Sequence, residues 1–175
     1  MKQEANLLPK SAARSGRLLQ GFKGVTVHET GNYRKTADAK SHATYMQGAG
    51  KNSQVSAHWY VDDERAVLMM PEEEVAWHAG DGTKNGGGNM CTVAIEMCCN
   101  WGYLPPEYAG MQADVKAAAQ ASEEEKAEAM RRFAATVDNA AQLGAEMLHR
   151  NGIKVADGFV WQHNHWSPYG KDCPH

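Results

Sequence analysis

The chain has 175 residues, a hydrophobic content of 42% and a formal net charge of −3. A chain of this length is expected to form one domain with a single substantial core, and its slightly acidic balance provides no basic surface for nucleic acid. No apolar run approaches the ~18 residues needed to span a bilayer, and the N-terminal residues lack the apolar core of a secretory signal. We therefore expect one domain over residues 1–175, synthesised in the cytoplasm as a monomer without membrane insertion.

The first predicted strand ends at a histidine. Residues 1–23 show no regular pattern and are expected to form an irregular N-terminal arm. Residues 25–28 form a β-branched run after Gly24, which predicts a buried strand with His28 at its C-terminal end. Strand ends that enter loops are where α/β proteins place reactive groups, so His28 is a candidate functional residue.

A helix and a hairpin are predicted next. Thr36 or Asp38 is suited to cap a helix that runs to about Gly48. Residues 55–61 and 65–70 flank a short acidic turn, which is typical of a β-hairpin.

The second half of the chain predicts a central strand and a long helix. Residues 92–97 are the strongest candidate for a central strand, and their single charge, Glu96, is costly to bury unless it has a partner or a role. Ser122 and Glu125 form a capping box that opens a helix with apolar residues at helical spacing to about residue 150.

A last strand is predicted over residues 159–162, and His163 follows directly at its C-terminal end. Together these elements predict an α/β fold with a mixed central sheet of about five strands and two substantial helices. Because helices connect some of the strands, at least part of the sheet is expected to be parallel.

The cysteines are expected to be reduced. Cys98 and Cys99 are neighbours whose side chains point to opposite faces of a strand, so they are a poor disulfide pair. The sequence also has no Cys-x-x-Cys motif, which argues against a zinc ribbon or a thioredoxin site. We expect three structural thiols in a reducing compartment and one ligand, Cys173.

The C-terminal stretch predicts half of a metal site. Cys173 follows His163 by ten residues and His165 by eight, with turn-forming residues between, so a loop can bring one histidine and the thiolate to one ion. With His28 this gives two imidazoles and a thiolate, and the fourth position of a catalytic zinc ion is left for water. A fourth side chain, His165 or His175, would instead close the site and make it structural.

The chemistry of such a site is amide hydrolysis if a base and a cation lie beside the ion. Zinc makes water a nucleophile near neutral pH and polarises a carbonyl. Glu96 is the carboxylate that the strand pattern places inside, where it is suited to take the proton of the water. Lys171 lies two residues before Cys173 and is suited to stabilise a developing oxyanion.

The chain resembles the type 2 zinc N-acetylmuramoyl-L-alanine amidases, whose fold is shared with peptidoglycan recognition proteins and many phage endolysins. The matching stretches occur in the family's order and are GVTVHETGN (24–32), ADAKSHATYM (37–46), VSAHWYVDD (55–63), EVAWHAGDG (74–82), TVAIEMCCN (92–100) and WQHNHWSPYGKDCP (161–174). Each stretch is a weak signal alone, but six in order form a strong one.

The resemblance implies a reaction and roles for the same residues. It implies that His28, a histidine of the last motif and Cys173 bind one Zn²⁺, and that Glu96 and Lys171 serve catalysis. The implied reaction is hydrolysis of the amide between the lactyl group of N-acetylmuramic acid and L-alanine in peptidoglycan. Some relatives carry a Tyr at the position of Ala57, so here the catalytic role falls more heavily on Glu96.

The choice between His163 and His165 follows from strand register. The segment before Lys171 is two residues longer than the Trp-Ser-Gly-Lys link of phage relatives, and counting back from Cys173 favours His165. Counting forward along the predicted strand favours His163, and strand register controls the direction of a side chain more firmly than loop length does. We therefore predict His163 as the ligand.

The resemblance further implies that His78 contacts the muramyl peptide, with a loop histidine without a role as the alternative, and that the protein lyses bacterial cell walls as a phage or prophage endolysin. Trp77 is a candidate substrate-binding residue that could stack on a sugar ring, and packing in the core or on the surface is its alternative. Two alternatives remain. Recognition proteins on this fold can bind peptidoglycan without cutting it, although they typically lack the cysteine ligand. A zinc hydrolase of another peptidoglycan amide would use the same site.

Overall fold

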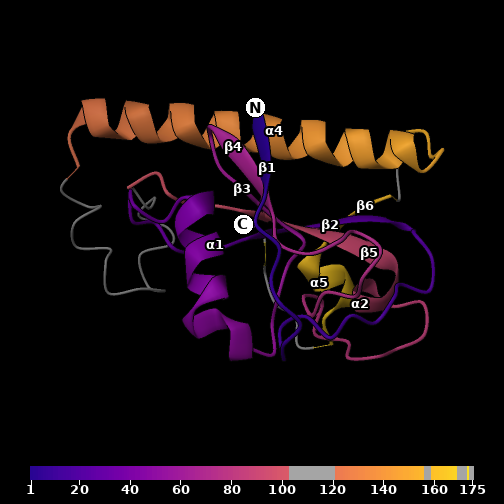
Figure 1. Cartoon of the computed structure of the whole chain (residues 1–175). Helices are drawn as coiled ribbons and strands as arrows, with labels where there is room; N and C mark the ends of the chain where they lie inside the picture. The colour runs from indigo at the N-terminus through magenta and orange to yellow at the C-terminus, as the bar shows by residue number, and fades with distance from the viewer. Residues whose placement is uncertain (103–120, 156–158, 169–172, 174–175) are drawn as a thin grey trace.

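The computed structural model describes residues 1–102, 121–155, 159–168 and 173, and these residues form a six-stranded mixed sheet between helical layers (Figure 1). The strand order across the sheet is β1-β4-β3-β5-β2-β6. The strands are β1 (Lys2–Ala5), β2 (Gly24–Glu29), β3 (Trp59–Val61), β4 (Arg65–Leu68), β5 (Thr92–Met97) and β6 (Val160–Gln162). Strands β3 and β4 form the predicted antiparallel hairpin, whereas β5 and β2 pair in parallel with their neighbours. The predicted α/β class with a partly parallel sheet is confirmed.

Strand β1 corrects the expectation that residues 1–23 are irregular throughout, and it adds a strand to the about five that were expected. It pairs in parallel with β4 at the edge of the sheet. Its sequence, Lys-Gln-Glu-Ala, has no apolar alternation, because an edge strand is held by backbone hydrogen bonds and buries little surface. A side-chain hydrogen bond from Gln3 to Glu146 adds a contact with the long helix.

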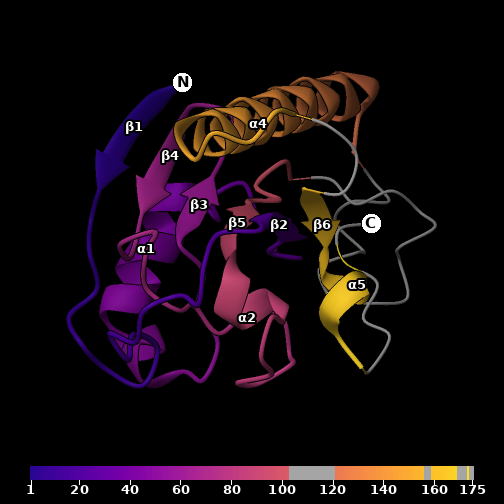
Figure 2. The same cartoon turned by 90° about the vertical axis from the view of Figure 1, so that its right-hand side faces the viewer.

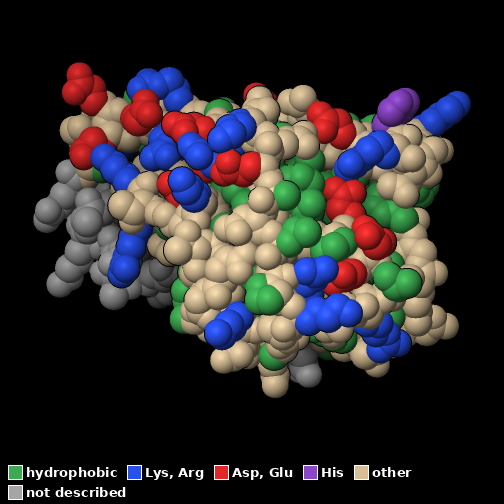
Figure 3. Space-filling view, in the orientation of Figure 1, with side chains coloured by type: hydrophobic (Ala, Val, Ile, Leu, Met, Phe, Trp, Pro, Cys, Tyr) green, Lys and Arg blue, Asp and Glu red, His purple; other side chains and the backbone are tan. Residues whose placement is uncertain are grey.

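Helix α4 (Glu123–Arg150) covers one face of the sheet (Figures 1 and 2). The predicted capping box is present, with the Ser122 hydroxyl accepting from the Glu125 backbone and the Glu125 carboxylate accepting from the Ser122 backbone. The apolar face of the helix packs on alternate residues of the strands; the buried members of this layer are Val25, Trp59, Val61, Ala66, Val93, Ile95, Met97, Ala140, Leu143 and Met147. The opposite face carries acidic and basic side chains, which gather along the upper edge of the molecule in Figure 3.

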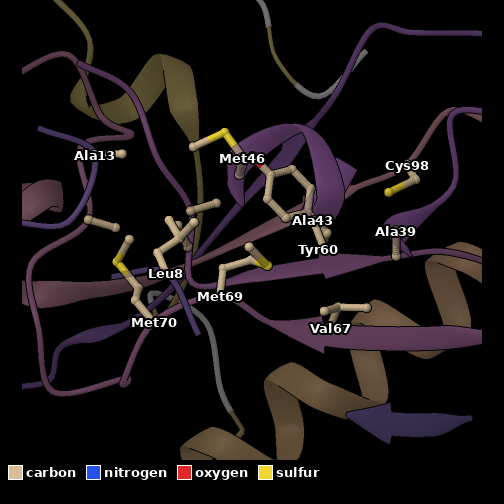
Figure 4. Close-up of a cluster of buried hydrophobic side chains, with 13 residues drawn as sticks. Leu8, Ala13, Ala39, Ala43, Met46, Tyr60, Val67, Met69, Met70 and Cys98 are labelled. Atoms are coloured by element: carbon tan, nitrogen blue, oxygen red, sulfur yellow. The ribbon is translucent and has the colours of Figure 1, made fainter. Parts of the chain in front are cut away.

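Helix α1 (Ala39–Gln47) packs on the other face of the sheet. Asp38, one of the two predicted N-caps, accepts a hydrogen bond from the Ser41 backbone at 2.7 Å. The buried Asp62 of the hairpin turn accepts from the backbone N–H of Ala39, which ties the start of the helix to the sheet. The cluster beneath the helix is shown in Figure 4 and contains Leu8, Ala13, Ala39, Ala43, Met46, Ala57, Tyr60, Val67, Met69, Met70, Ala76, Ala94 and Cys98.

Three short helices were not predicted: η1 (Ala49–Asn52), α2 (Gly88–Cys91) and α5 (His163–Trp166). Each has only four residues, which is too few for an apolar period to be recognisable in the sequence. Among the described residues, no helix combines the length and the apolar character that crossing a membrane requires. The cysteines are free thiols; Cys91, Cys98 and Cys99 are buried and Cys173 is half-buried.

The sheet places polar residues at one edge of one face. Strands β2, β3, β5 and β6 run in parallel, so their carboxyl ends meet at the same edge. On β2 the side chains of Val25 and Val27 pack toward α4, which leaves Thr26 and His28 on the opposite face. Parallel sheets commonly bind ligands at the carboxyl ends of their strands.

Candidate metal centre and active site

His28, His163 and Cys173 converge at this edge of the sheet. Their ligand atoms all lie within 4.8 Å of one another. Nδ1 of His28 is 3.2 Å from Nδ1 of His163 and 4.0 Å from Sγ of Cys173. His28 comes from the end of β2 and His163 from the first residue of α5, and both are buried.

The donor set and its spacing fit a zinc ion. Two imidazoles and a thiolate are ligands that zinc favours. Two nitrogens that bind one tetrahedral zinc ion at ~2.0–2.1 Å lie about 3.3 Å apart, which agrees with the separation of the two Nδ1 atoms. The half-buried position of Cys173 leaves one side of the cluster open to the cavity.

Backbone groups hold Cys173 in place. The N–H of His163 donates to the Cys173 carbonyl at 3.0 Å, so the two residues are joined directly. The N–H of Glu29, which follows His28 in β2, points at Sγ of Cys173 at 3.4 Å. The carbonyl of Glu29 also lies 3.9 Å from Sγ, so both backbone groups of Glu29 contact the sulfur.

His165 points elsewhere. Its ring lies against Trp161, with centroids 4.3 Å apart, and against Trp166 at 4.6 Å. Strand β6 ends at residue 162 and α5 begins at residue 163, so His163 and His165 are separated by about 200° around a helix turn. The strand register that favoured His163 thus applies only up to Gln162, and the helix turns His165 away from His28 and Cys173.

Glu96 lies in the same row as His28. The two residues are register partners on β5 and β2, and Tyr60 is the partner of Glu96 on β3. Register partners in a sheet project to the same face, so the three side chains share one side. Glu96 is half-buried, and His28, Tyr60 and Glu96 all line one cavity, to which His163 and Cys173 also contribute.

Tyr60 is a site residue that the sequence reasoning missed. Ala57, the position at which some relatives carry a Tyr, is buried in the cluster beneath α1. Tyr60 is 8% exposed; burial, and after it the charge of Glu96, raises the pKa of its hydroxyl. The alternation of Trp59 and Tyr60 along β3 would have indicated the correct face, because Trp59 packs toward α4.

The cavity has a volume of about 460 Å³ and is open to solvent on one side. It brings together most of the residues that the sequence singled out. Its walls are formed by His28, Glu29, Thr30, Gly31, His42, Tyr45, Met46, Ser53, Val55, Ser56, Tyr60, Trp77, His78, Glu96, His163 and Cys173.

Of the two predicted substrate contacts, Trp77 is half-buried in the wall and also packs against Val75, Met90 and Cys91. His78 is 5% exposed, and its Nδ1 lies 2.9 Å from Nε2 of His28. Burial, together with the charges that neighbouring histidines would carry, holds the pKa of His78 well below its usual value. Lys171, the second predicted catalytic residue, lies outside the described residues, as does His175.

His58 has the structural role that its position suggests. It is fully buried, its Nε2 donates to the carbonyl of Glu74 at 2.8 Å, and its Nδ1 accepts from the N–H of Ala94 at 2.9 Å. Burial lowers its pKa to about 4, so the ring is neutral and can act as both donor and acceptor. It joins β5 to the segment that leads into Trp77 and His78.

A family model described as N-acetylmuramoyl-L-alanine amidase matches residues 19–175. The chain belongs to this family. It is 35% identical over 150 residues to the amidase CwlH of Bacillus subtilis, which covers 86% of this chain and 46% of CwlH. The B. subtilis amidase XlyA is 33% identical over 150 residues, which covers 86% of this chain and 38% of XlyA.

The solved catalytic domain of XlyA superimposes on the structure with a TM-score of 0.72 at 27% identity, over 99% of this chain and 90% of that domain. By contrast, the chain spans less than half the full length of the curated relatives CwlH and XlyA. Members of the family depend in general on zinc, and the cluster of His28, His163 and Cys173 is close enough to bind a metal.

Proposed function

We propose that the protein is a zinc-dependent N-acetylmuramoyl-L-alanine amidase that hydrolyses the bond between the lactyl carbonyl of N-acetylmuramic acid and the amine of L-alanine in bacterial peptidoglycan. Residues 1–175 act as one catalytic domain, in which residues 1–23 form an N-terminal arm that contains β1. The domain acts as a monomer at the cell wall, in the manner of an endolysin.

The observation that carries this proposal is the convergence of two imidazoles and a thiolate on the cavity that Glu96 also lines. A structural zinc site would be closed by a fourth side chain. Here the other nearby histidine of the last motif, His165, faces two tryptophan rings instead. Membership of the amidase family supplies the reaction class, and the names of CwlH and XlyA support the bond that is cut.

The roles of the protein's own groups follow from their chemistry. His28, His163 and Cys173 would hold the ion, which when bound supplies a polarised carbonyl and a more acidic water. Glu96 accepts the proton of the attacking water and returns a proton to the alanine nitrogen as the C–N bond breaks. The products are a lactyl carboxylate and the protonated α-amine of L-alanine, with one water consumed. Lys171, by the prediction from sequence, stabilises the oxyanion.

Digestion of purified peptidoglycan tests the proposal. The zinc-loaded protein is expected to release free L-alanine amino groups while the glycan strands stay intact. A chelator-treated sample, and the same sample after zinc is restored, provide the matched control. New amino groups on residues other than L-alanine would indicate a hydrolase of another amide. Binding to peptidoglycan without release of any amine would overturn the enzymatic assignment and favour a recognition module.

A further inference from the structure

We propose that His78 is a positioning residue: it fixes the tautomer of His28 in which Nε2 carries the proton and Nδ1 directs its lone pair toward the shared metal site of His28, His163 and Cys173. The inference rests on the proposed function for its purpose, because it concerns how one ligand is prepared for zinc. It differs from the substrate contact that the sequence suggested for His78.

The direction of the hydrogen bonds is set by a backbone carbonyl. The ring proton of His78 is donated in a hydrogen bond to the carbonyl of Gly88, which also accepts from the hydroxyl of Thr92 at 2.8 Å. Since Nδ1 of His78 faces His28, this proton is on Nε2, which also lies 3.5 Å from the hydroxyl of Thr92. A neutral imidazole with a proton on Nε2 has an acceptor at Nδ1.

That acceptor decides the state of His28. Nε2 of His28 is 2.9 Å from Nδ1 of His78, so it must donate for the contact to be a hydrogen bond. The proton of a neutral His28 is then on Nε2, and its Nδ1 has a lone pair directed toward Nδ1 of His163 and Sγ of Cys173. The opposite tautomer would place two lone pairs against each other at the His28–His78 contact.

The loop holds His78 firmly enough to act in this way. The side-chain carbonyl of Asn89 accepts from the backbone N–H groups of both His78 and Ala79 at 2.7 Å. The N–H of Gly88 donates to Asp81 at 2.6 Å. This hydrogen bond fixes Gly88, whose carbonyl is the first group in the series of hydrogen bonds that leads through His78 to His28. A Cβ at Gly88 would lie 2.7 Å from Trp166 and from Ala79, so only glycine lets this backbone approach so closely.

The burial of His78 favours positioning over substrate contact. The side chain is 5% exposed, and its two nitrogens face His28 and the Gly88–Thr92 pair. Groups that orient metal-binding histidines in this manner typically affect metal affinity by 10–100-fold when removed.

Asparagine and leucine provide a matched pair of substitutions. Their side chains have nearly the same shape, but only asparagine places an acceptor oxygen close to the position of the histidine Nδ1. His78→Leu is expected to weaken zinc binding by about 10–100-fold. His78→Asn is expected to keep the zinc affinity close to that of the unchanged protein, because His28 retains its acceptor.

Two measurements test the inference without use of catalytic activity. Long-range ¹H–¹⁵N NMR spectra of the metal-free protein report which ring nitrogen of His28 carries the proton, and competition with a coloured chelator reports the zinc dissociation constant. We expect a protonated Nε2 in the unchanged protein and in His78→Asn, and a mixture of tautomers with weakened zinc binding in His78→Leu.

A proton on Nδ1 of His28 in the unchanged protein would overturn the inference, as would equal zinc affinity of the unchanged protein and a folded His78→Leu variant. If His78→Leu does not fold, the tautomer of the unchanged protein decides alone. Failure of the unchanged protein to bind zinc would overturn the proposed function instead, and the tautomer measured without metal would still decide the role of His78.

Discussion

The two faces of the central sheet are built from the same strands but differ at the carboxyl ends of those strands. Toward α4, the strands present Val25, Trp59 and Ile95, which pack in a dry layer against the helix. On the other face the next residues along the same strands are Thr26, Tyr60 and Glu96, and the row continues to His28 at the end of β2.

The difference shows how a short strand can serve stability and function at once. Because side chains alternate across a strand, a change at one residue affects the apolar layer and a change at its neighbour affects the site. The comparison therefore predicts that substitutions separate into two classes. Changes in the row of His28, Tyr60 and Glu96 alter zinc binding or catalysis, whereas changes on the α4 face alter the free energy of unfolding.

The largest expected effect is on catalysis by Glu96→Gln. Removal of a general base typically lowers the rate by about 10²–10⁴-fold, and the amide keeps the shape of the side chain. Zinc content and the unfolding midpoint are expected to stay near those of the unchanged protein. The measurement is the initial rate of amine release from peptidoglycan, with bound zinc determined on the same samples. Near-normal activity would remove Glu96 from the role of base.

The neighbouring residue provides the matched control. Ile95 is completely buried under α4, so Ile95→Ala is expected to lower the free energy of unfolding by about 2–5 kcal/mol. Zinc affinity and the rate per folded molecule are expected to be unchanged. Urea unfolding measures the first quantity and chelator competition the second. A large loss of zinc affinity in the folded variant would show that the two faces are not independent.

His58 predicts a pH dependence of stability. Its pKa is lowered by burial from 6.5 to about 4, so below pH 6.5 the unfolded chain binds a proton that the folded protein does not. The stability contributed by the neutral ring is present above pH 6.5 and is lost as the pH falls toward about 4, by about 3 kcal/mol in total. Urea unfolding across this range should show a steeper loss for the unchanged protein than for His58→Gln. Equal slopes would contradict this account of His58.

The smallest effect is expected at the capping box of α4. Ser122→Ala removes the acceptor for the Glu125 backbone N–H and should cost about 1 kcal/mol of unfolding free energy. The site lies on the other face, so catalysis and zinc binding should not change. A change in zinc affinity without a change in stability would contradict the separation of the two faces.

The sequence predicted the parts of the fold that bury apolar surface with a clear period. Strand β5 matches the predicted residues 92–97, and α4 begins at the predicted capping box. Strand β1 was missed because its four residues are polar and are held by pairing with β4. Helix α5 was missed because one turn of helix has no recognisable pattern, although it determines which histidine faces the site.

The candidate site was predictable in its chemistry and less so in its contacts. His28, Glu96 and Cys173 stand out as unusual residues at strand ends or near turns, and the structure brings them to one cavity. The contact between His78 and His28 joins residues fifty positions apart through a loop, and no local pattern reveals it. The position of Tyr60 in the cavity was not predicted for a different reason, since an aromatic residue in a strand ordinarily indicates core packing.

X-ray absorption at the zinc edge of the loaded protein tests the central claim most directly, because it reports the ligands without relying on activity. The account predicts one zinc ion per chain, bound by two imidazoles and one sulfur, with the sulfur contribution lost in Cys173→Ser. A zinc environment without sulfur in the unchanged protein, or one that Cys173→Ser leaves unaltered, would contradict the assignment of the metal centre.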